Sequence, residues 1–121
     1  MIQDLLNEYA SNAIATTTID YADRKSVQRF NSLADRMRTI ADEVVDLGQD
    51  AVVQFVSLLD AEPAAPWAAV HLVEKAELDP ETLSRCFSIV EKTKAKAESQ
   101  GNIADAMIKE MWLKEWKKKK M

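Results

Sequence analysis

The chain contains a single histidine, His71, and this residue is the first candidate for acid–base chemistry. Glu74 follows three positions later, so on a helix the imidazole and the carboxylate would share a face and could act together as a general base. No cysteine or second histidine stands at metal-ligand spacing from His71, which argues against a zinc site. We therefore interpret His71 as a surface or interlayer residue. A minor enzyme that uses His71 with Glu74 remains the second alternative.

The other reactive residue types also lack the surroundings that catalysis needs. Cys86 falls on the apolar stripe of its predicted helix, which favours a small buried hydrophobe over a nucleophile. The acidic residues within 42–46 could hold a metal only if facing helices added ligands. Glu-x-x-His, the di-iron signature of helical bundles, is absent because Ala68 stands three positions before His71. We therefore predict no catalytic residue, no bound metal and no cofactor.

Length and composition favour one all-α domain. The chain has 121 residues, 47% of them hydrophobic, with only two glycines and three prolines. An all-β fold would need many more turn residues, and two glycines cannot build a phosphate-binding loop. No apolar run approaches the roughly 18 residues of a membrane span, and residues 1–4 do not resemble a signal peptide. A single cysteine cannot form an internal disulfide, so we expect a reducing cytoplasm.

Charge is distributed unevenly along the chain. Residues 1–91 carry a net charge of −9, whereas residues 92–121 carry +5. The basic part includes Lys92 and Lys96, which share a helix face with Arg85. A nucleic-acid-binding helical repeat that uses this basic third is therefore the first alternative function. The acidic remainder and a pI near 5.0 disfavour affinity based on phosphate contacts.

The stretch from residue 50 to residue 76 predicts a central helical hairpin. Apolar residues recur there in steps of three and four, the period of an amphipathic helix, on both sides of a break. Pro63 makes that break because it lacks an N–H and biases Glu62 away from helical angles. Pro66 fits the first turn of the second helix. The two apolar stripes are Val52, Phe55, Val56 and Leu59, then Ala69, Leu72, Val73 and Ala76.

Two helices are predicted before this hairpin, and together they form an N-terminal capping hairpin over residues 1–47. Helix 2–15 ends at three consecutive threonines, because β-branched residues lose side-chain freedom in a helix. Helix 27–47 has a heptad-like seam, which an antiparallel neighbour in the same domain explains better than a free coiled coil. Gly48 suits the position just past that helix, and Asp50 suits the N-cap of the next one.

Two further helices are predicted in a C-terminal hairpin over residues 79–118. Asp79 as N-cap and Pro80 at the first helical position give its first helix a strong start. Asn102 resembles the cap of the last helix. One apolar face of the last helix contains Ala104, Met107, Ile108 and Met111, and Trp112, Leu113 and Trp116 make the helix apolar over more than one side. We expect the basic tail, residues 117–121, to fray.

Six helices in three consecutive hairpins predict a stacked-repeat architecture. The second and third hairpins share a plan and a period of about 45 residues, the spacing of HEAT and armadillo repeats. We therefore predict a single domain that forms a right-handed, HEAT/armadillo-like stack of three antiparallel helical hairpins. An irregular bundle of five or six helices is the alternative fold.

Four runs of residues resemble a known family. They are FNSLADRMRTIADEVVDLG from Phe30 to Gly48, FVSLL from Phe55 to Leu59, WAA from Trp67 to Ala69, and MWLKEW from Met111 to Trp116. Together they resemble a small bacterial family catalogued as a domain of unknown function (number twenty-nineteen). The resemblance covers the chain from about Val27 onward and implies HEAT-like helical repeats without established enzymatic residues. Some members of the family resemble immunity proteins that neutralise a toxin encoded nearby.

Protein binding is the function that these patterns favour. Second helices of stacked hairpins usually line one surface of the stack, and tryptophans there would suit a protein interface. We predict an immunity-like interaction module, monomeric or homodimeric, that binds one protein partner on its second-helix surface. The predicted contact residues are Trp67, His71, Glu74, Lys109, Trp112 and Trp116. The alternative is that these tryptophans pack between the layers.

Overall fold

The structure is a computed structural model that describes residues 2–121, and this part of the chain is helical without any strand. Helical periodicity and the scarcity of glycine and proline explain this, so the predicted all-α class is confirmed. The α-helices are α1 (Ile2–Thr16), α2 (Arg24–Asp46), α3 (Gln49–Val56), α4 (Ala64–Lys75), α5 (Pro80–Ser99) and α6 (Ile103–Lys120). A 3₁₀ turn, η1 (Ser57–Asp60), continues α3.

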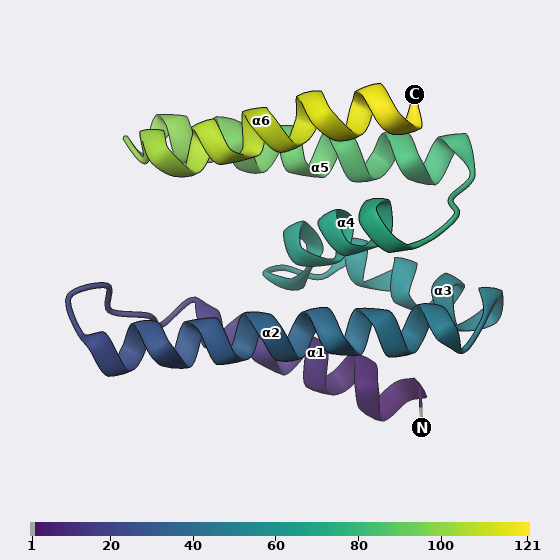
Figure 1. The fold of residues 1–121 in the computed structure, drawn as a ribbon, viewed down its shortest axis with the longest axis horizontal. Coiled ribbons are helices and arrows are strands. Elements are labelled where there is room, and N and C mark those ends of the chain that lie inside the picture. The colour runs from purple at the N-terminus through teal and green to yellow at the C-terminus, as the bar shows by residue number, and fades with distance from the viewer. Residues whose placement is uncertain (1) are drawn as a thin grey trace.

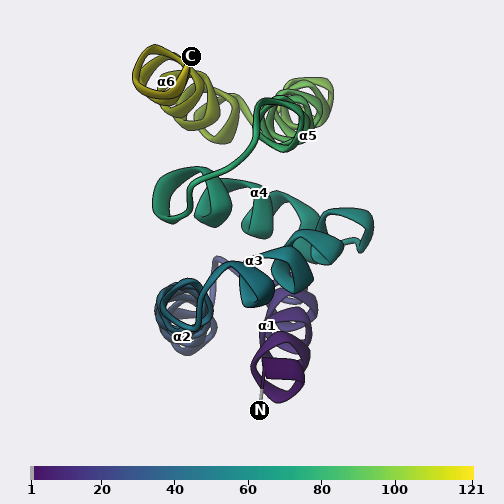
Figure 2. The ribbon, with the colours of Figure 1, turned by 90° about the vertical axis from the view of Figure 1, so that its right-hand side faces the viewer.

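The helices are arranged in three layers that follow the order of the chain (Figure 1). The first layer is α1 with α2, the middle layer is α3 and η1 with α4, and the last layer is α5 with α6. Seen end-on, α1 and α5 lie on one side of the molecule, while α2 and α6 lie on the other (Figure 2). Each pair of helices buries its apolar stripe against the neighbouring layer, because short helices are not stable alone in water.

The middle layer is shorter than the layers on either side of it. At 1.5 Å per residue, the 12 residues of α4 span about 18 Å, whereas the 23 residues of α2 span about 35 Å. The 20 residues of α5 span about 30 Å. As a result, the first and last layers extend past the end of the middle layer near the start of α4 (Figure 1).

Helix ends follow local sequence signals in most places. Asp79 caps α5, since its carboxylate accepts from the Thr82 N–H at 3.2 Å, and Asn102 caps α6 by accepting from the Asp105 N–H at 3.2 Å. The predicted N-cap at Asp50 is wrong. Gly48, at φ +109°, occupies that position, and Asp50 lies in the first turn of α3, where its charge still favours the positive end of the helix.

Two other boundaries differ from the sequence-based expectation. Helix α2 begins at Arg24 rather than Val27, because Asp23 accepts from the Lys25 N–H at 3.0 Å and caps the charged segment. Helix α6 continues to Lys120, although the sequence predicts a frayed tail. Lys117 pairs with Glu91 of α5, and Lys119 lies 4.6 Å from the centre of the Trp116 ring. These contacts give the basic segment partners within the fold.

Helix α6 does not bury the face that contains Met107, Ile108 and Met111, although the sequence pattern predicts that this face packs on the core. Ala104, Met107, Ile108 and Met111 are exposed, while Ala106 and Leu113 are buried. Trp112 and Trp116 pack against the core from the same side as Leu113. Because α6 carries apolar residues around most of its circumference, its orientation is decided by which side buries more area. The tryptophan side buries more than the methionine side can.

Candidate functional site

His71 is buried at the contact between the middle and first layers. It is 7% exposed, and its Nδ1 lies 2.6 Å from the hydroxyl of Tyr9, which is fully buried on α1. The Tyr9 ring meets the Phe55 ring edge-on at 5.1 Å between centroids. The cluster joins α1, which carries Tyr9, to α3 and α4, which carry Phe55 and His71. His71 is therefore an interlayer residue and does not lie on the binding surface predicted for it.

The protonation state of His71 follows from its burial. Burial lowers its pKa to about 4, and the positive charges of Lys75 and Arg38 act in the same direction against a smaller opposing effect of Asp42. Burial also raises the pKa of Tyr9 above its ordinary value. A neutral imidazole with its proton on Nε2 lets the Tyr9 hydroxyl donate to Nδ1. At pH 7 the imidazole of His71 is therefore neutral, and its Nδ1 already accepts a hydrogen bond from Tyr9.

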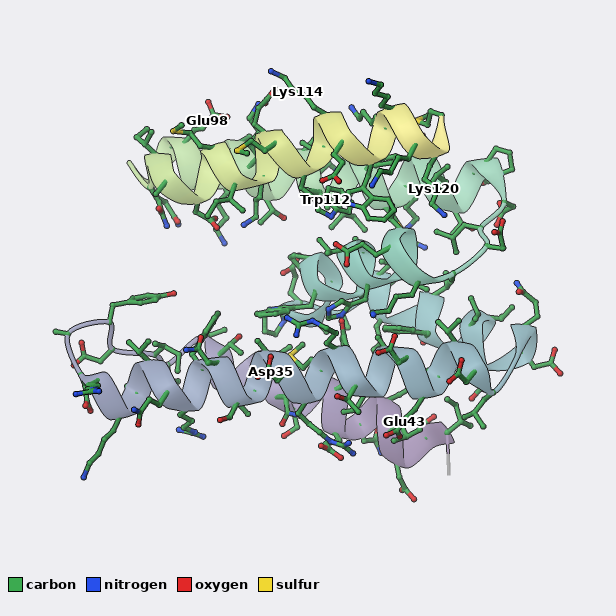
Figure 3. The ribbon with its side chains drawn as sticks, viewed as in Figure 1. Asp35, Glu43, Glu98, Trp112, Lys114 and Lys120 are labelled. Carbon is green, nitrogen blue, oxygen red and sulfur yellow. The ribbon has the colours of Figure 1, made fainter. Side chains whose placement is uncertain are left out.

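Glu74 points to the opposite layer. Its Oε2 accepts a hydrogen bond from Trp112 Nε1 at 2.8 Å, which links α4 to α6. Figure 3 shows Trp112 pointing from α6 toward α4, while Lys114 points away from it. His71 and Glu74 thus hold different neighbours, one in the first layer and one in the last. The carboxylate does not orient the imidazole, as a general-base pair would require.

The remaining predicted contact residues are half-buried at the edges of the layers. Trp67 lies 5.9 Å from the Phe30 ring, measured between centroids, and Trp112 lies 5.8 Å from the Phe87 ring. Lys109 pairs with Asp105 at 2.7 Å on its own helix. Much of this set therefore contributes to packing between layers, which was the alternative interpretation of the tryptophans.

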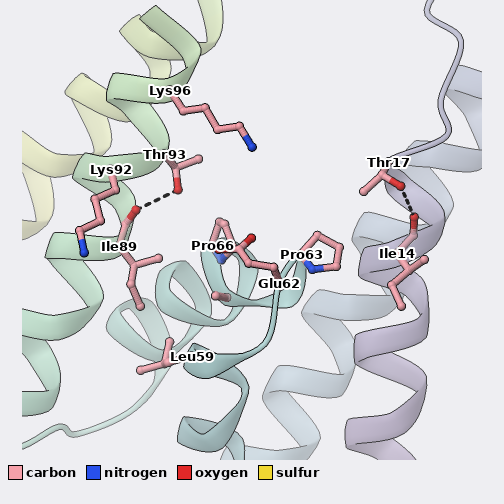
Figure 4. Close-up of a pocket in the computed structure, with 11 residues that line it drawn as sticks. Ile14, Thr17, Leu59, Glu62, Pro63, Pro66, Ile89, Lys92, Thr93 and Lys96 are labelled. Atoms are coloured by element: carbon pink, nitrogen blue, oxygen red, sulfur yellow. Dashed lines mark hydrogen bonds between the residues drawn. The ribbon is translucent and has the colours of Figure 1, made fainter. Parts of the chain in front are cut away.

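A groove opens on the side of the molecule formed by α1 and α5, where the middle layer ends (Figure 4). It encloses about 820 Å³. One wall is the end of α1, the other is α5, and the η1–α4 turn lies between them. The α1 wall is Ile14 and Thr17; the α5 wall is Ile89, Lys92, Thr93 and Lys96; the turn contributes Leu59, Glu62, Pro63, Ala65 and Pro66.

The α5 wall of this groove is basic. Among residues 2–121, neither Lys92 nor Lys96 forms an ion pair, and both are exposed. The Thr93 hydroxyl donates to the Ile89 carbonyl at 2.8 Å, so its donor is already used. A second hollow of about 510 Å³ continues along α5 and shares Leu59, Ile89 and Lys92 with the groove. There Arg85 pairs with Asp60.

Sequence reasoning identified the basic face of α5 but missed the groove. Arg85, Lys92 and Lys96 are visible as one helix face at spacings of seven and four. The opposite wall comes from Ile14 and Thr17, near the other end of the chain, and no sequence signal joins them to α5. Their proximity depends on how far the middle layer extends, which only the three-dimensional arrangement reveals.

Two further residue classes bear on chemistry. Cys86 is fully buried, as predicted, and burial raises the pKa of its thiol to about 11, so the reactive thiolate is scarce at pH 7. Over residues 2–121, no group of three or more His, Cys, Asp or Glu side chains is placed to hold a metal ion. Within the same residues, no helix combines the length and apolar character needed to cross a membrane.

Neither the family models, nor the curated proteins, nor the solved structures contain a match to this chain.

Proposed function

We propose that this chain is a non-enzymatic protein-binding module, and that it takes an acidic, partly apolar segment of a partner protein in the groove between α1 and α5. The observation that carries this proposal is the pairing of apolar walls with two lysines that have no ion-pair partner among residues 2–121. The predicted second-helix surface is less suited, because His71 and Glu74 are engaged in contacts between layers.

The dimensions favour a peptide segment over a small molecule. The groove and its continuation follow α5 from Glu81 to Lys96, about 22 Å at 1.5 Å per residue. An extended chain rises about 3.3 Å per residue, so roughly seven residues would fill this length. The hollow is open along one side, whereas small-molecule sites enclose most of their ligand. A strand-like segment of a partner fits this shape.

Charge decides the kind of segment. Lys92 and Lys96 are one helical turn apart on the α5 wall, and Glu62, in the turn between the walls, is the one carboxylate among the lining residues. Acidic side chains of the partner would pair with the two lysines, and apolar ones would cover Ile14, Ile89 and the prolines. Complementary charge of this kind sets specificity and association rate more than raw affinity.

The architecture supports a binding role without requiring chemistry. Three consecutive layers, each joined to the next through apolar stripes, are what a HEAT/armadillo-like stack would contain, and such stacks commonly serve as binding scaffolds. The immunity-like role implied by the family resemblance is one form of this function. It would make the bound segment part of a toxin.

Because the partner is unidentified, the test starts from a random heptapeptide display library selected on the intact chain. We expect enriched peptides that combine Asp or Glu with apolar residues. Fluorescence polarisation then measures the affinity of one such peptide. Reversing both lysines, Lys92→Glu with Lys96→Glu, should weaken binding by roughly 10-fold or more, about 1.4 kcal/mol. Raising the salt concentration should weaken the wild-type affinity as well.

The matched control is Lys118→Glu with Lys120→Glu, which reverses two exposed lysines outside the groove and should leave the peptide affinity unchanged. Equal binding to the groove variant and the control would overturn the proposal. Selection of peptides without acidic residues would do the same. Salt-sensitive binding to a DNA duplex with no peptide binding would replace it with the nucleic-acid alternative.

A further inference from the structure

Helix α6 carries an apolar outer face that no other part of the described chain covers. Four large side chains on it are exposed: Ile103 at 58%, Met107 at 61%, Ile108 at 65% and Met111 at 69%. Their spacing of four, five and eight positions from Ile103 places them along one side of the helix. Monomeric proteins rarely leave a continuous apolar patch of more than a few hundred Å² in water.

The position of this patch at the end of the stack makes it unusual. End layers of stacked repeats normally present a polar outer face, since they have no further neighbour. The first layer follows that rule. The exposed residues of α2 are almost all polar or charged, among them Asn31, Asp35, Arg38, Thr39, Asp42 and Glu43. A second copy could not bury its α6 patch against that polar face without leaving polar groups unpaired.

We propose that the outer face of α6 is a homodimer interface, in which the α6 helices of two copies pack against each other in antiparallel orientation across a two-fold axis. The patch is self-complementary in character, as a two-fold contact requires. Its methionines are flexible and adapt to the irregular surface of an identical partner.

Charge selects the antiparallel orientation. Lys114 and Lys118 are exposed on the C-terminal half of α6, whereas Ile103 and Ala104 begin the N-terminal half. Antiparallel packing centred on the patch sets Ile103 of one copy opposite Met111 of the other, and it carries Lys114 and Lys118 past the start of the partner's α6, clear of the patch. Parallel packing would set Lys114 against Lys114 and Lys118 against Lys118, and like charges facing each other disfavour an arrangement.

The patch alone is roughly half the size of a standard interface, so the dimer that it supports is a weak one that forms as the protein concentration rises. Four side chains, each about two-thirds exposed, offer on the order of 400–500 Å² of mostly apolar surface per copy. A standard interface buries about 800 Å² per partner, with a polar rim around an apolar centre. Lys114, Glu115 and Lys118 are exposed just beyond the C-terminal end of the patch and would lie at the edge of the contact. The groove between α1 and α5 contains no α6 residue, so dimerisation would leave it open.

The test measures mass in solution by size-exclusion chromatography with light scattering over a wide range of protein concentration. The wild-type chain should approach twice its 13.6 kDa mass as concentration rises. The double variant Met107→Lys with Met111→Lys should stay monomeric, with a dimer dissociation constant raised at least about 100-fold. Circular dichroism checks that the variant keeps its helix content.

A matched control places two lysines on the polar outer face of the first layer, Asn31→Lys with Thr39→Lys, and should dimerise as the wild type does. A wild-type chain that remains monomeric at the highest concentration overturns the proposal, as does a lysine variant of α6 that dimerises normally. Peptide binding in the groove is measured separately, so either proposal can fail without the other.

Discussion

The outer face of the first layer is polar, whereas the outer face of the last layer is apolar. Both layers are pairs of long helices that pack against the same middle layer. Helix α2 has one apolar stripe, so it can face the core in only one way and leaves charged residues outside. Helix α6 has apolar residues around most of its circumference, so burying the tryptophans leaves the methionines in water. A helix at the end of the stack presents a polar outer face only if its apolar residues are confined to one side. The total number of apolar residues matters less than this distribution.

The inner contacts of the two layers differ as well. Tyr9, Met37 and Ile40 of the first layer are fully buried. The last layer contacts the middle layer partly through Trp112, which is half-buried and bonded to Glu74. Cys86 and Val90 of α5 are also fully buried, so the last layer is attached through an apolar contact and this polar link together.

The largest expected difference is in the free energy of unfolding, between two variants that each replace one methionine with alanine, the first in α2 and the second in α6. Met37→Ala removes a fully buried side chain of α2 and should lower the free energy of unfolding by about 2–5 kcal/mol. Met111→Ala, at an exposed position on α6, should change it by less than about 0.5 kcal/mol in the monomeric range. Urea denaturation of both variants provides the measurement. Similar losses would show that the outward orientation of α6 is wrong.

A smaller effect concerns pH and the contact between the middle layer and the first layer. The pKa of His71 falls from 6.5 to about 4 on folding, so the unfolded chain takes up a proton first as pH falls. The stabilisation is complete above pH 6.5 and is lost toward pH 4, which amounts to about 1–2 kcal/mol between pH 7.5 and pH 5.

The control for this pH dependence is His71→Gln, which keeps a polar group near Tyr9 but does not titrate. Urea denaturation of this variant across the same pH range should show a flatter dependence. Carboxylates such as Glu8, whose pKa is lowered mainly by its hydrogen bond to Arg36, affect both proteins equally. An unchanged slope would mean that the imidazole is not buried between the layers.

The smallest predicted effect probes the attachment of the last layer. Trp112→Phe removes the N–H that bonds Glu74 and keeps most of the ring, so it should cost about 1 kcal/mol. Combined with Glu74→Leu in a double-mutant cycle, the two changes should be less than additive by about 0.5–1 kcal/mol. Strict additivity would indicate that this link between α4 and α6 does not form in solution.

Local features of this fold were predictable from sequence, and contacts between distant segments were not. The caps at Asp79 and Asn102 depend on residues within one turn, and the confirmed all-α class depends on helical periodicity. Tyr9 and His71 are 62 residues apart, and nothing in either segment signals their hydrogen bond. The orientation of α6 was also missed, because two of its sides are apolar and only the competition for buried area separates them.

The contrast between the closed first layer and the open last layer is tested most directly by hydrogen–deuterium exchange at low and high protein concentration. Exchange reports, segment by segment, which helices become more protected when copies associate. We predict that peptides covering residues 103–111 gain protection at high concentration, while peptides covering α1 and α2 do not change. Protection that appears on α2 instead, or that does not depend on concentration anywhere, would contradict this account.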